Sequence, residues 1–246
     1  MRFYAIGDIH GQREMLEAAH ERILRDRSSC GDKVAPVVHL GDLVDRGPDS
    51  KGVIELLQEG RTRGEPWLVV RGNHDAMFAD FLGATSNPDD ALKPGLTWLN
   101  ARVGGDATLR SYGVRTGSFR SRRAIVQNAR EAVPASHRRF LESLPLFHAT
   151  PDLLFVHAGI RPGVPVTLQD PTDLLWIREE FLSDPRDHGP LIVHGHTPVQ
   201  EPQNCGNRVN LDTGAGFGRK LTAAVFEGRE CWVLTDEGRD PLRPLG

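Results

Sequence analysis

The chain has 246 residues, of which 39% are hydrophobic and 26% are charged, and its formal net charge is −3. This balance is typical of a globular protein, argues against intrinsic disorder and gives no sign of nucleic-acid binding. No apolar run approaches the roughly 20 residues that span a bilayer, and the start of the chain lacks the pattern of a signal peptide. We therefore expect a cytoplasmic protein without a membrane or nucleic-acid partner.

Five short apolar runs have the length of strands and end abruptly in Gly, Asp, Asn or His. They cover residues 3–6, 37–40, 67–70, 153–156 and 191–193. Two helical patterns lie between the first three runs. Their apolar faces consist of Met15, Leu16, Ala19, Ile23 and Leu24, and of Val53, Ile54, Leu56 and Leu57, respectively. Asp49 or Ser50 could cap the second helix.

The order of strand, helix and strand predicts βαβ units and a largely parallel sheet. In open α/β sheets, ligands bind beyond the carboxyl ends of the strands. The polar residues that follow the five runs should therefore meet at one rim, although they are far apart in the sequence.

Residues 81–144 break the pattern, because apolar residues are sparser there and glycines are frequent. We interpret this region as an insertion within a single domain, 1–246, that acts as a lid or specificity element. A helix is expected over 136–144. The basic run from Arg120 to Arg123 is either a solvated face or a docking patch for an anionic substrate. Further on, 221–226 and 231–234 flank a predicted hairpin turn.

Six side chains near the ends of the apolar runs are candidate metal ligands: Asp8, His10, Asp42, Asn73, His157 and His196. Asp8 and His10 are two residues apart, and in an extended segment such side chains point the same way and could bind one ion. Carboxylate, amide and imidazole ligands together suit Mn, Fe or Zn. The three cysteines are far apart and form no C-x-x-C pair, which argues against a disulfide framework or a thiolate zinc site.

Five sequence blocks carry a resemblance to a known family. They are Gly7-Asp8-Ile9-His10-Gly11, Gly41-Asp42-Leu43-Val44-Asp45-Arg46-Gly47, Gly72-Asn73-His74-Asp75, His157-Ala158-Gly159 and Gly195-His196-Thr197. In order and spacing they resemble the blocks of the phosphoprotein phosphatase (PPP) family of calcineurin-like metallophosphoesterases, especially bacterial serine/threonine protein phosphatases. Pro198, where many relatives in the wider superfamily have a second histidine, matches the PPP branch. The resemblance implies an α/β fold with a central β-sandwich of mixed sheets, flanked by helices, and a metal site at the C-terminal ends of the strands.

The resemblance also implies a role for each site residue. Asp8, His10 and Asp42 would hold one divalent ion, and Asp42, Asn73, His157 and His196 a second, with Asp42 bridging. The expected ions are Mn²⁺, with Fe or Zn as alternatives. His74 would be the general acid, Asp45 would orient it, and Arg46 and Arg178 would bind the phosphate. A metal-bridging hydroxide would attack the phosphorus directly, so no phosphoenzyme is needed.

These roles lead to an expected function and to two alternatives. We expect a serine/threonine protein phosphatase that hydrolyses phosphoprotein monoesters, with a phosphorylated protein or a small phosphoester as its partner. The first alternative is a hydrolase of dinucleoside polyphosphates such as diadenosine tetraphosphate. Nucleotide-cleaving relatives typically carry alanine where this chain has Asp45, which favours the first function. The second alternative is a non-catalytic metal-holding module, which the complete ligand set argues against. The sequence carries no signal for the oligomeric state.

Overall fold

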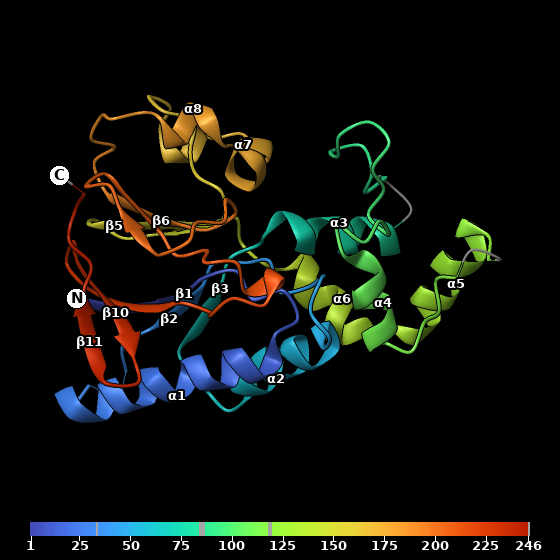
Figure 1. Ribbon diagram of the computed structural model, residues 1–246, viewed down its shortest axis with the longest axis horizontal. Coiled ribbons are helices and arrows are strands. Elements are labelled where there is room, and N and C mark those ends of the chain that lie inside the picture. The colour runs from blue at the N-terminus through green and yellow to red at the C-terminus, as the bar shows by residue number, and fades with distance from the viewer. Residues whose placement is uncertain (33, 84–86, 118–119, 246) are drawn as a thin grey trace.

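Two β-sheets packed face to face form the centre of the computed structural model (Figure 1), which describes residues 1–32, 34–83, 87–117 and 120–245. In order across the first sheet, the strands are β11 (Gly238–Pro241), β10 (Glu230–Thr235), β9 (Ala223–Glu227), β1 (Arg2–Ile6), β2 (Val37–His39) and β3 (Trp67–Val69). The second sheet consists of β4 (Phe147–Ala149), β5 (Leu153–Val156), β6 (Leu191–His194), β8 (Arg208–Asn210) and β7 (Gln203–Asn204).

Both sheets are mixed, which confirms the expected sandwich. In the first sheet β1, β2 and β3 are parallel, whereas β9, β10 and β11 run antiparallel to their neighbours. In the second sheet β5, β6 and β8 are parallel, and β4 and β7 pair antiparallel at the edges. The expectation of a largely parallel sheet is thus correct only for the part of each sheet that carries the polar loops. Short hairpin connections add the antiparallel strands, including β11, which the sequence analysis missed.

Side-chain alternation along the strands explains the layers. Phe3 and Ala5 in β1 point into the core between the sheets, whereas Tyr4 and Ile6 point to the opposite face and pack with the helices. The helices are α1 (Arg13–Cys30), α2 (Ser50–Thr62), α3 (Asn73–Leu82), α4 (Gly105–Ser111), α5 (Arg122–Ala132), α6 (Ala135–Glu142), α7 (Pro171–Trp176) and α8 (Glu179–Leu182). Figure 1 shows α1 and α2 beneath the first sheet and α7 and α8 on the opposite side of the sandwich.

The first two helices follow the predicted pattern with one correction. Asp49 is the N-cap of α2, and its side chain accepts a hydrogen bond of 2.8 Å from the Gly52 N–H. In α1, Leu16, Ala19 and Ile23 are buried, but Leu24 is 53% exposed and does not belong to the apolar face. One residue of offset along a helix turns a side chain by about 100°, which carries Leu24 out of the core-facing stripe.

The region predicted as an insertion contains α4, α5 and α6, of which the sequence predicted only the last. These helices pack beside α2 and α3 at one end of the sandwich (Figure 1). Residues 84–86 and 118–119 of the insertion lie outside the described residues. In the basic run, Arg122 forms an ion pair with Asp89 and donates a 2.8 Å hydrogen bond to the Asn87 side chain. That guanidinium therefore helps to join two parts of the insertion.

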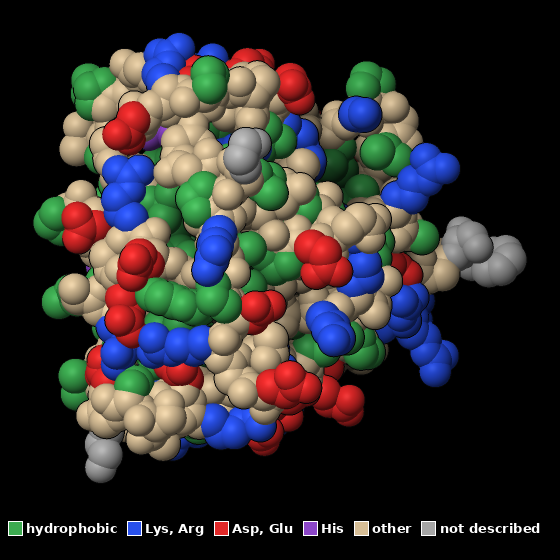
Figure 2. Space-filling view, turned by 60° about the vertical axis from the view of Figure 1, so that its left-hand side comes forward, with side chains coloured by type: hydrophobic (Ala, Val, Ile, Leu, Met, Phe, Trp, Pro, Cys, Tyr) green, Lys and Arg blue, Asp and Glu red, His purple; other side chains and the backbone are tan. Residues whose placement is uncertain are grey.

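No described helix combines the length and the apolar character needed to cross a bilayer. Figure 2 shows basic and acidic side chains interspersed over one face, in keeping with the small net charge of −3.

Candidate active site

The polar loops that follow β1, β2, β3, β5 and β6 meet at one rim of the sandwich, as expected. Among the described residues, the non-glycine residues with positive φ are all predicted site residues: His10 (48°), Asp42 (49°), Asp45 (75°), Arg46 (66°) and His196 (66°). Such backbone conformations cost about 1–3 kcal/mol each and persist only where the surroundings impose them. The positive φ of His10 also corrects the expectation that Asp8 and His10 share an extended segment, because the backbone turns sharply at His10.

The loops after β2 and β3 lie against each other. A Cβ on Gly72 would lie 2.1 Å from the Asp42 backbone nitrogen, so only glycine permits this approach. Asp75, in the first turn of α3, accepts hydrogen bonds of 2.9 Å from the N–H groups of Gly72 and Leu43, which joins the two loops. Asp42 in turn accepts a 2.9 Å hydrogen bond from the His74 N–H. These bonds fix Asp42 beside the start of α3.

A hydrogen bond between the two sheets brings the remaining loops together. The His196 N–H, after β6, donates to the Asp8 carboxylate, after β1, at 3.0 Å. Asp8, Asp42, Asn73 and His157 are all at most 2% exposed. Residues from both sheets therefore enclose one buried polar centre.

The hydrogen bonds of His10 and His157 determine which ring nitrogen can bind a metal. The Nδ1–H of His10 donates to the Val44 carbonyl and that of His157 to the Leu40 carbonyl, each at 2.8 Å. When each ring is neutral, its lone pair is therefore on Nε2, which faces the polar centre. The His157 Nε2 lies 2.8 Å from the Asn73 Oδ1, and the His196 Nδ1 lies 2.9 Å from the same oxygen.

This arrangement fits a bound cation. With the His157 ring neutral, its Nε2 and the Asn73 Oδ1 are both acceptors, and two buried acceptors at this distance repel unless a positive charge lies beside them. The His196 Nε2 is buried with no hydrogen-bond partner among the described residues. The donor set of carboxylates, amide oxygen and imidazoles matches a borderline divalent ion.

The potential ligands form two overlapping groups with Asp42 in both. His10, Asp42 and His74 make one group, and Asp8, Asp42 and His157 the other, with the ligand atoms of each group within 4.8 Å of one another. The prediction placed Asp8 with His10, whereas Asp8 groups here with Asp42 and His157, and His10 groups with Asp42 and His74. Asp42 is common to both groups, as a bridging ligand would be.

The charges of the buried carboxylates also favour a bound cation. Burial, together with the charges of Asp212 and Asp42, raises the pKa of Asp8 well above its usual range. Burial alone would raise the pKa of Asp42 as well, but the positive charges that the surrounding histidines carry when protonated, led by His157, outweigh it and lower that pKa. A divalent ion would remove the repulsion between these carboxylates.

Asp212 is a site residue that the sequence analysis missed. It is 2% exposed, and its carboxylate accepts a 2.9 Å hydrogen bond from the Gly214 N–H. Burial raises its pKa, and the charge of Asp42 contributes. The signal was present, because Asp212 and Gly214 follow the short strand β8 as Asp8 follows β1, but β8 has only three residues.

His74 and Asp45 form the predicted pair. The His74 Nδ1–H donates to the Asp45 carboxylate at 2.6 Å. Two side chains of the insertion bind the same carboxylate: the Trp98 indole N–H donates at 2.8 Å and the Thr108 hydroxyl at 2.7 Å. Asp45 and Trp98 are completely buried. The sequence analysis did not identify Trp98 or Thr108, which lie more than 50 residues from Asp45 and belong to no recognised motif.

The two predicted phosphate-binding arginines lie at the edge of the buried centre. The Arg46 guanidinium contacts the His10 Nε2 and lies 3.1 Å from the His74 Nε2, so it reaches over both histidines. Arg178 is exposed and donates a 3.2 Å hydrogen bond to the hydroxyl of Thr197, the neighbour of His196. Both positions would let a guanidinium contact a phosphate at the metal centre.

Comparison with known proteins agrees with this geometry. The family model described as calcineurin-like phosphoesterase matches residues 1–224. The chain belongs to the calcineurin-like phosphoesterases. Membership confirms the family resemblance of the five sequence blocks and makes the chain an enzyme of the metallophosphoesterase class of hydrolases. It also accounts for the two groups of potential ligands, because the family binds divalent metals.

Individual relatives resemble this calcineurin-like phosphoesterase over nearly its full length. It is 27% identical to the bis(5′-nucleosyl)-tetraphosphatase PrpE (asymmetrical) of Bacillus thuringiensis strain Al Hakam, covering 94% of this chain and 92% of the relative. The crystal structure of a candidate diadenosine tetraphosphatase has a TM-score of 0.61 and 24% identity, with 94% and 92% covered. A cold-active protein-tyrosine phosphatase of a psychrophilic Shewanella species also has a TM-score of 0.61, with 16% identity and 98% and 80% covered. The two solved structures show that the fold is shared.

Proposed function

We propose that the protein hydrolyses dinucleoside polyphosphates such as diadenosine tetraphosphate, by attack of water at a centre that holds two divalent ions. The full-length match to a relative named bis(5′-nucleosyl)-tetraphosphatase carries the choice of substrate. The buried ligand groups that share Asp42 support the proposal of two ions. Mn²⁺ is the expected ion, with Fe or Zn as alternatives that the same ligands would accept.

The residues of this chain would divide the chemistry among them. The ions, when bound, polarise the phosphate and lower the pKa of the attacking water. Arg46 and Arg178 would neutralise charge on the phosphate oxygens as the bond breaks. The His74 Nε2 faces the site, so a proton on this atom could pass to the departing oxygen. Asp45 would hold His74 in position through the Nδ1–H hydrogen bond.

A serine/threonine protein phosphatase remains a second candidate because of this His74–Asp45 pair. An alkoxide is a poor leaving group and needs a proton donor, whereas a nucleoside polyphosphate leaves more easily. The 2.6 Å contact between the His74 and Asp45 side chains supplies what the harder reaction requires. The relatives' names nevertheless favour the dinucleotide, and we expect phosphoprotein hydrolysis to be the slower activity.

One assay separates the two functions. The protein is loaded with Mn²⁺, and its kcat/KM is measured for diadenosine tetraphosphate and for a panel of phosphoserine and phosphothreonine peptides. We expect the dinucleotide to be preferred by more than about tenfold, which corresponds to about 1.4 kcal/mol of transition-state discrimination. A tenfold preference for any of the phosphopeptides would overturn the proposal in favour of the protein phosphatase.

A further inference from the structure

We infer that the ring of Phe217 is a stacking platform for the nucleobase next to the phosphate at Arg46. The inference rests on the proposed function and specifies how that site would recognise a nucleotide. Phe217 ends a short 3₁₀ turn, η2 (Ala215–Phe217), in the loop that begins with the buried carboxylate Asp212. The Arg46 guanidinium carbon lies 4.8 Å from the centre of the ring.

The exposure of Phe217 is unusual for this molecule. The side chain is 61% exposed, and Phe217 is the only exposed large aromatic residue among the residues that the structure describes. The Arg46 guanidinium lies over one face of the ring, and the high exposure leaves much of the remaining aromatic surface open to solvent. A single exposed apolar residue needs no explanation in itself. Its position beside a predicted phosphate-binding arginine is what suggests a ligand.

The turn that carries Phe217 is anchored by contacts with residues at the candidate metal centre. A Cβ on Gly216 would lie 2.7 Å from the His10 ring and 2.9 Å from the Arg46 side chain, so the turn packs directly on both residues. The Gln12 side-chain amide donates a 3.2 Å hydrogen bond to the Ala215 carbonyl. The turn that carries the Phe217 ring is therefore held against two predicted site residues, His10 and Arg46.

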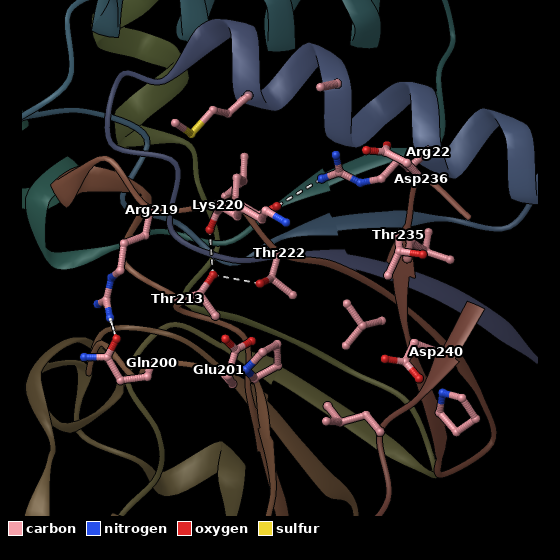
Figure 3. A pocket seen from close by; sticks show the side chains of 18 of the residues that line it. Arg22, Gln200, Glu201, Thr213, Arg219, Lys220, Thr222, Thr235, Asp236 and Asp240 are labelled. Carbon is pink, nitrogen blue, oxygen red and sulfur yellow. Dashed lines mark hydrogen bonds between the residues drawn. The ribbon is translucent and has the colours of Figure 1, made fainter. Parts of the chain in front are cut away.

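The same loop is held on its other side, where it forms one wall of a pocket of about 880 Å³ beneath α1 (Figure 3). Thr213 donates a 2.7 Å hydrogen bond to the Lys220 carbonyl and lies 2.7 Å from the Thr222 hydroxyl. Arg219 donates a 2.9 Å hydrogen bond to the Gln200 side chain. A loop anchored on both sides presents an exposed ring with little conformational entropy left to lose on binding.

A nucleobase suits this position better than the other aromatic group that a phosphatase could meet. In phosphotyrosine the ring is attached to the phosphate oxygen, so it would occupy the leaving-group position near His74. In a nucleotide the ribose separates the base from the phosphate, which lets the base reach past Arg46 to the rim. Stacking of a base on an aromatic side chain contributes about 1–3 kcal/mol by alanine substitution and does not depend on which base is present.

Equilibrium binding tests the platform without depending on turnover. Dissociation constants for adenosine 5′-diphosphate and for pyrophosphate are measured by calorimetry on the Mn²⁺-loaded protein. Phe217→Ala should weaken diphosphate nucleotide binding about tenfold, equivalent to about 1.4 kcal/mol. Binding of pyrophosphate, which has no base, should change less than twofold. Phe217→Leu should behave like alanine, whereas Phe217→Trp should keep the affinity of the wild-type protein.

Controls separate this inference from the proposed function. Leu168→Ala removes another exposed apolar side chain, 72% exposed and outside the site, and should leave both affinities unchanged. Equal weakening of both ligands in Phe217→Ala, or no weakening, would overturn the stacking platform. A selective loss of nucleotide affinity in a protein that fails to cleave diadenosine tetraphosphate would leave the platform supported and reject only the proposed function.

Discussion

Asp42 connects the two groups of potential metal ligands, and its replacement should affect both metal binding and stability. Asparagine keeps the oxygen that accepts the His74 N–H but removes the charge. We expect Asp42→Asn to lose bound metal and to abolish hydrolysis. The stability of the metal-free protein should fall, because the lowered pKa of Asp42 shows that its charge is favourable among the surrounding histidines, which outweighs the relief of repulsion with Asp8. Metal analysis and thermal unfolding in chelator measure both effects, and a fully active, metal-replete variant would refute the bridging role.

The loss of kcat on replacing His74 should depend strongly on which substrate is used. For a substrate with an alkoxide leaving group, His74→Asn should lower kcat about 10²- to 10⁴-fold, because general-acid catalysis is lost. The loss should be smaller for diadenosine tetraphosphate, whose leaving group needs less protonation. Steady-state kinetics with both substrates measures the difference. Since His74 also lies within one ligand group, metal content must be measured, and loss of metal would assign His74 to ligation.

For individual residues, the sequence predicted which side chains meet at the site. It did not predict their backbone conformations or the hydrogen bonds that position them. Asp8, Asn73, His157 and the others could be found because each ends a recognisable apolar run. The left-handed backbone at His10 and Arg46 could not be predicted, since only the packing of several loops imposes it. Trp98 and Thr108 escaped notice because an indole or hydroxyl in an irregular segment carries no signal until the fold places it beside Asp45.

The insertion holds the His74–Asp45 pair in place through hydrogen bonds. Besides the bonds to the Asp45 side chain, the Gly104 carbonyl accepts a 3.2 Å hydrogen bond from the Arg46 N–H. Trp98 is in turn held by its backbone N–H, which donates a 2.7 Å hydrogen bond to the Asp89 carboxylate. Asp89 also pairs with Arg122, so the first turn of α5 is linked to His74 through three residues, namely Asp89, Trp98 and Asp45. The insertion that we predicted to be a lid therefore also supports the buried Asp45 and His74 side chains.

Trp98→Phe tests this support, because it removes the indole N–H and keeps an aromatic side chain in the core. A hydrogen bond to a charged group contributes about 1.5–3 kcal/mol, so we expect a loss of stability in this range. We also expect kcat to fall more than KM rises, since His74 loses its orientation while phosphate binding survives. Urea unfolding and steady-state kinetics measure the two effects. Phe78→Leu, altering a neighbour stacked on Trp98, is the matched control that should change stability without lowering kcat.

Most of the elements that sequence reasoning missed are short, although the missed helix α5 has 11 residues. The seven residues of α4 and the four of β11 are too few to display a periodicity of 3.6 or 2. Long elements such as α1 and α2 have enough apolar positions to be recognised. The mixed topology of the sheets came from the family resemblance, because local patterns do not determine how strands pair.

Two buried histidines couple the stability of the whole molecule to pH. His20 on α1 and His39 on β2 lie 2.9 Å apart through their Nε2 atoms. The His39 Nδ1–H donates to the Leu68 carbonyl, so the His39 Nε2 accepts the His20 N–H and both rings are neutral. Burial lowers the pKa of His20 to about 2 and that of His39 to about 4, from an ordinary value of 6.5.

Stability should therefore fall as the pH falls below about 6.5. Between 6.5 and about 4 the unfolded chain binds protons at both histidines, whereas the folded protein does not. Each histidine contributes at most about 1.4 kcal/mol per pH unit. Urea unfolding of the metal-free protein from pH 7.5 to about 4.5 should show a shallower dependence in the double variant His20→Leu/His39→Leu. Identical slopes in the two proteins would show that other groups control the acid sensitivity.

The strained loops have a consequence for how this protein can evolve. Glycine adopts positive φ at no steric cost, so replacing His196 with glycine would relieve strain in the folded backbone, and its backbone N–H could still donate to Asp8. The strain relief at this position is worth about 1–3 kcal/mol. Selection for heat resistance alone would therefore favour the loss of this predicted metal ligand. Descendants that keep the sandwich but carry glycine at this position would be more stable proteins with less capacity to bind metal.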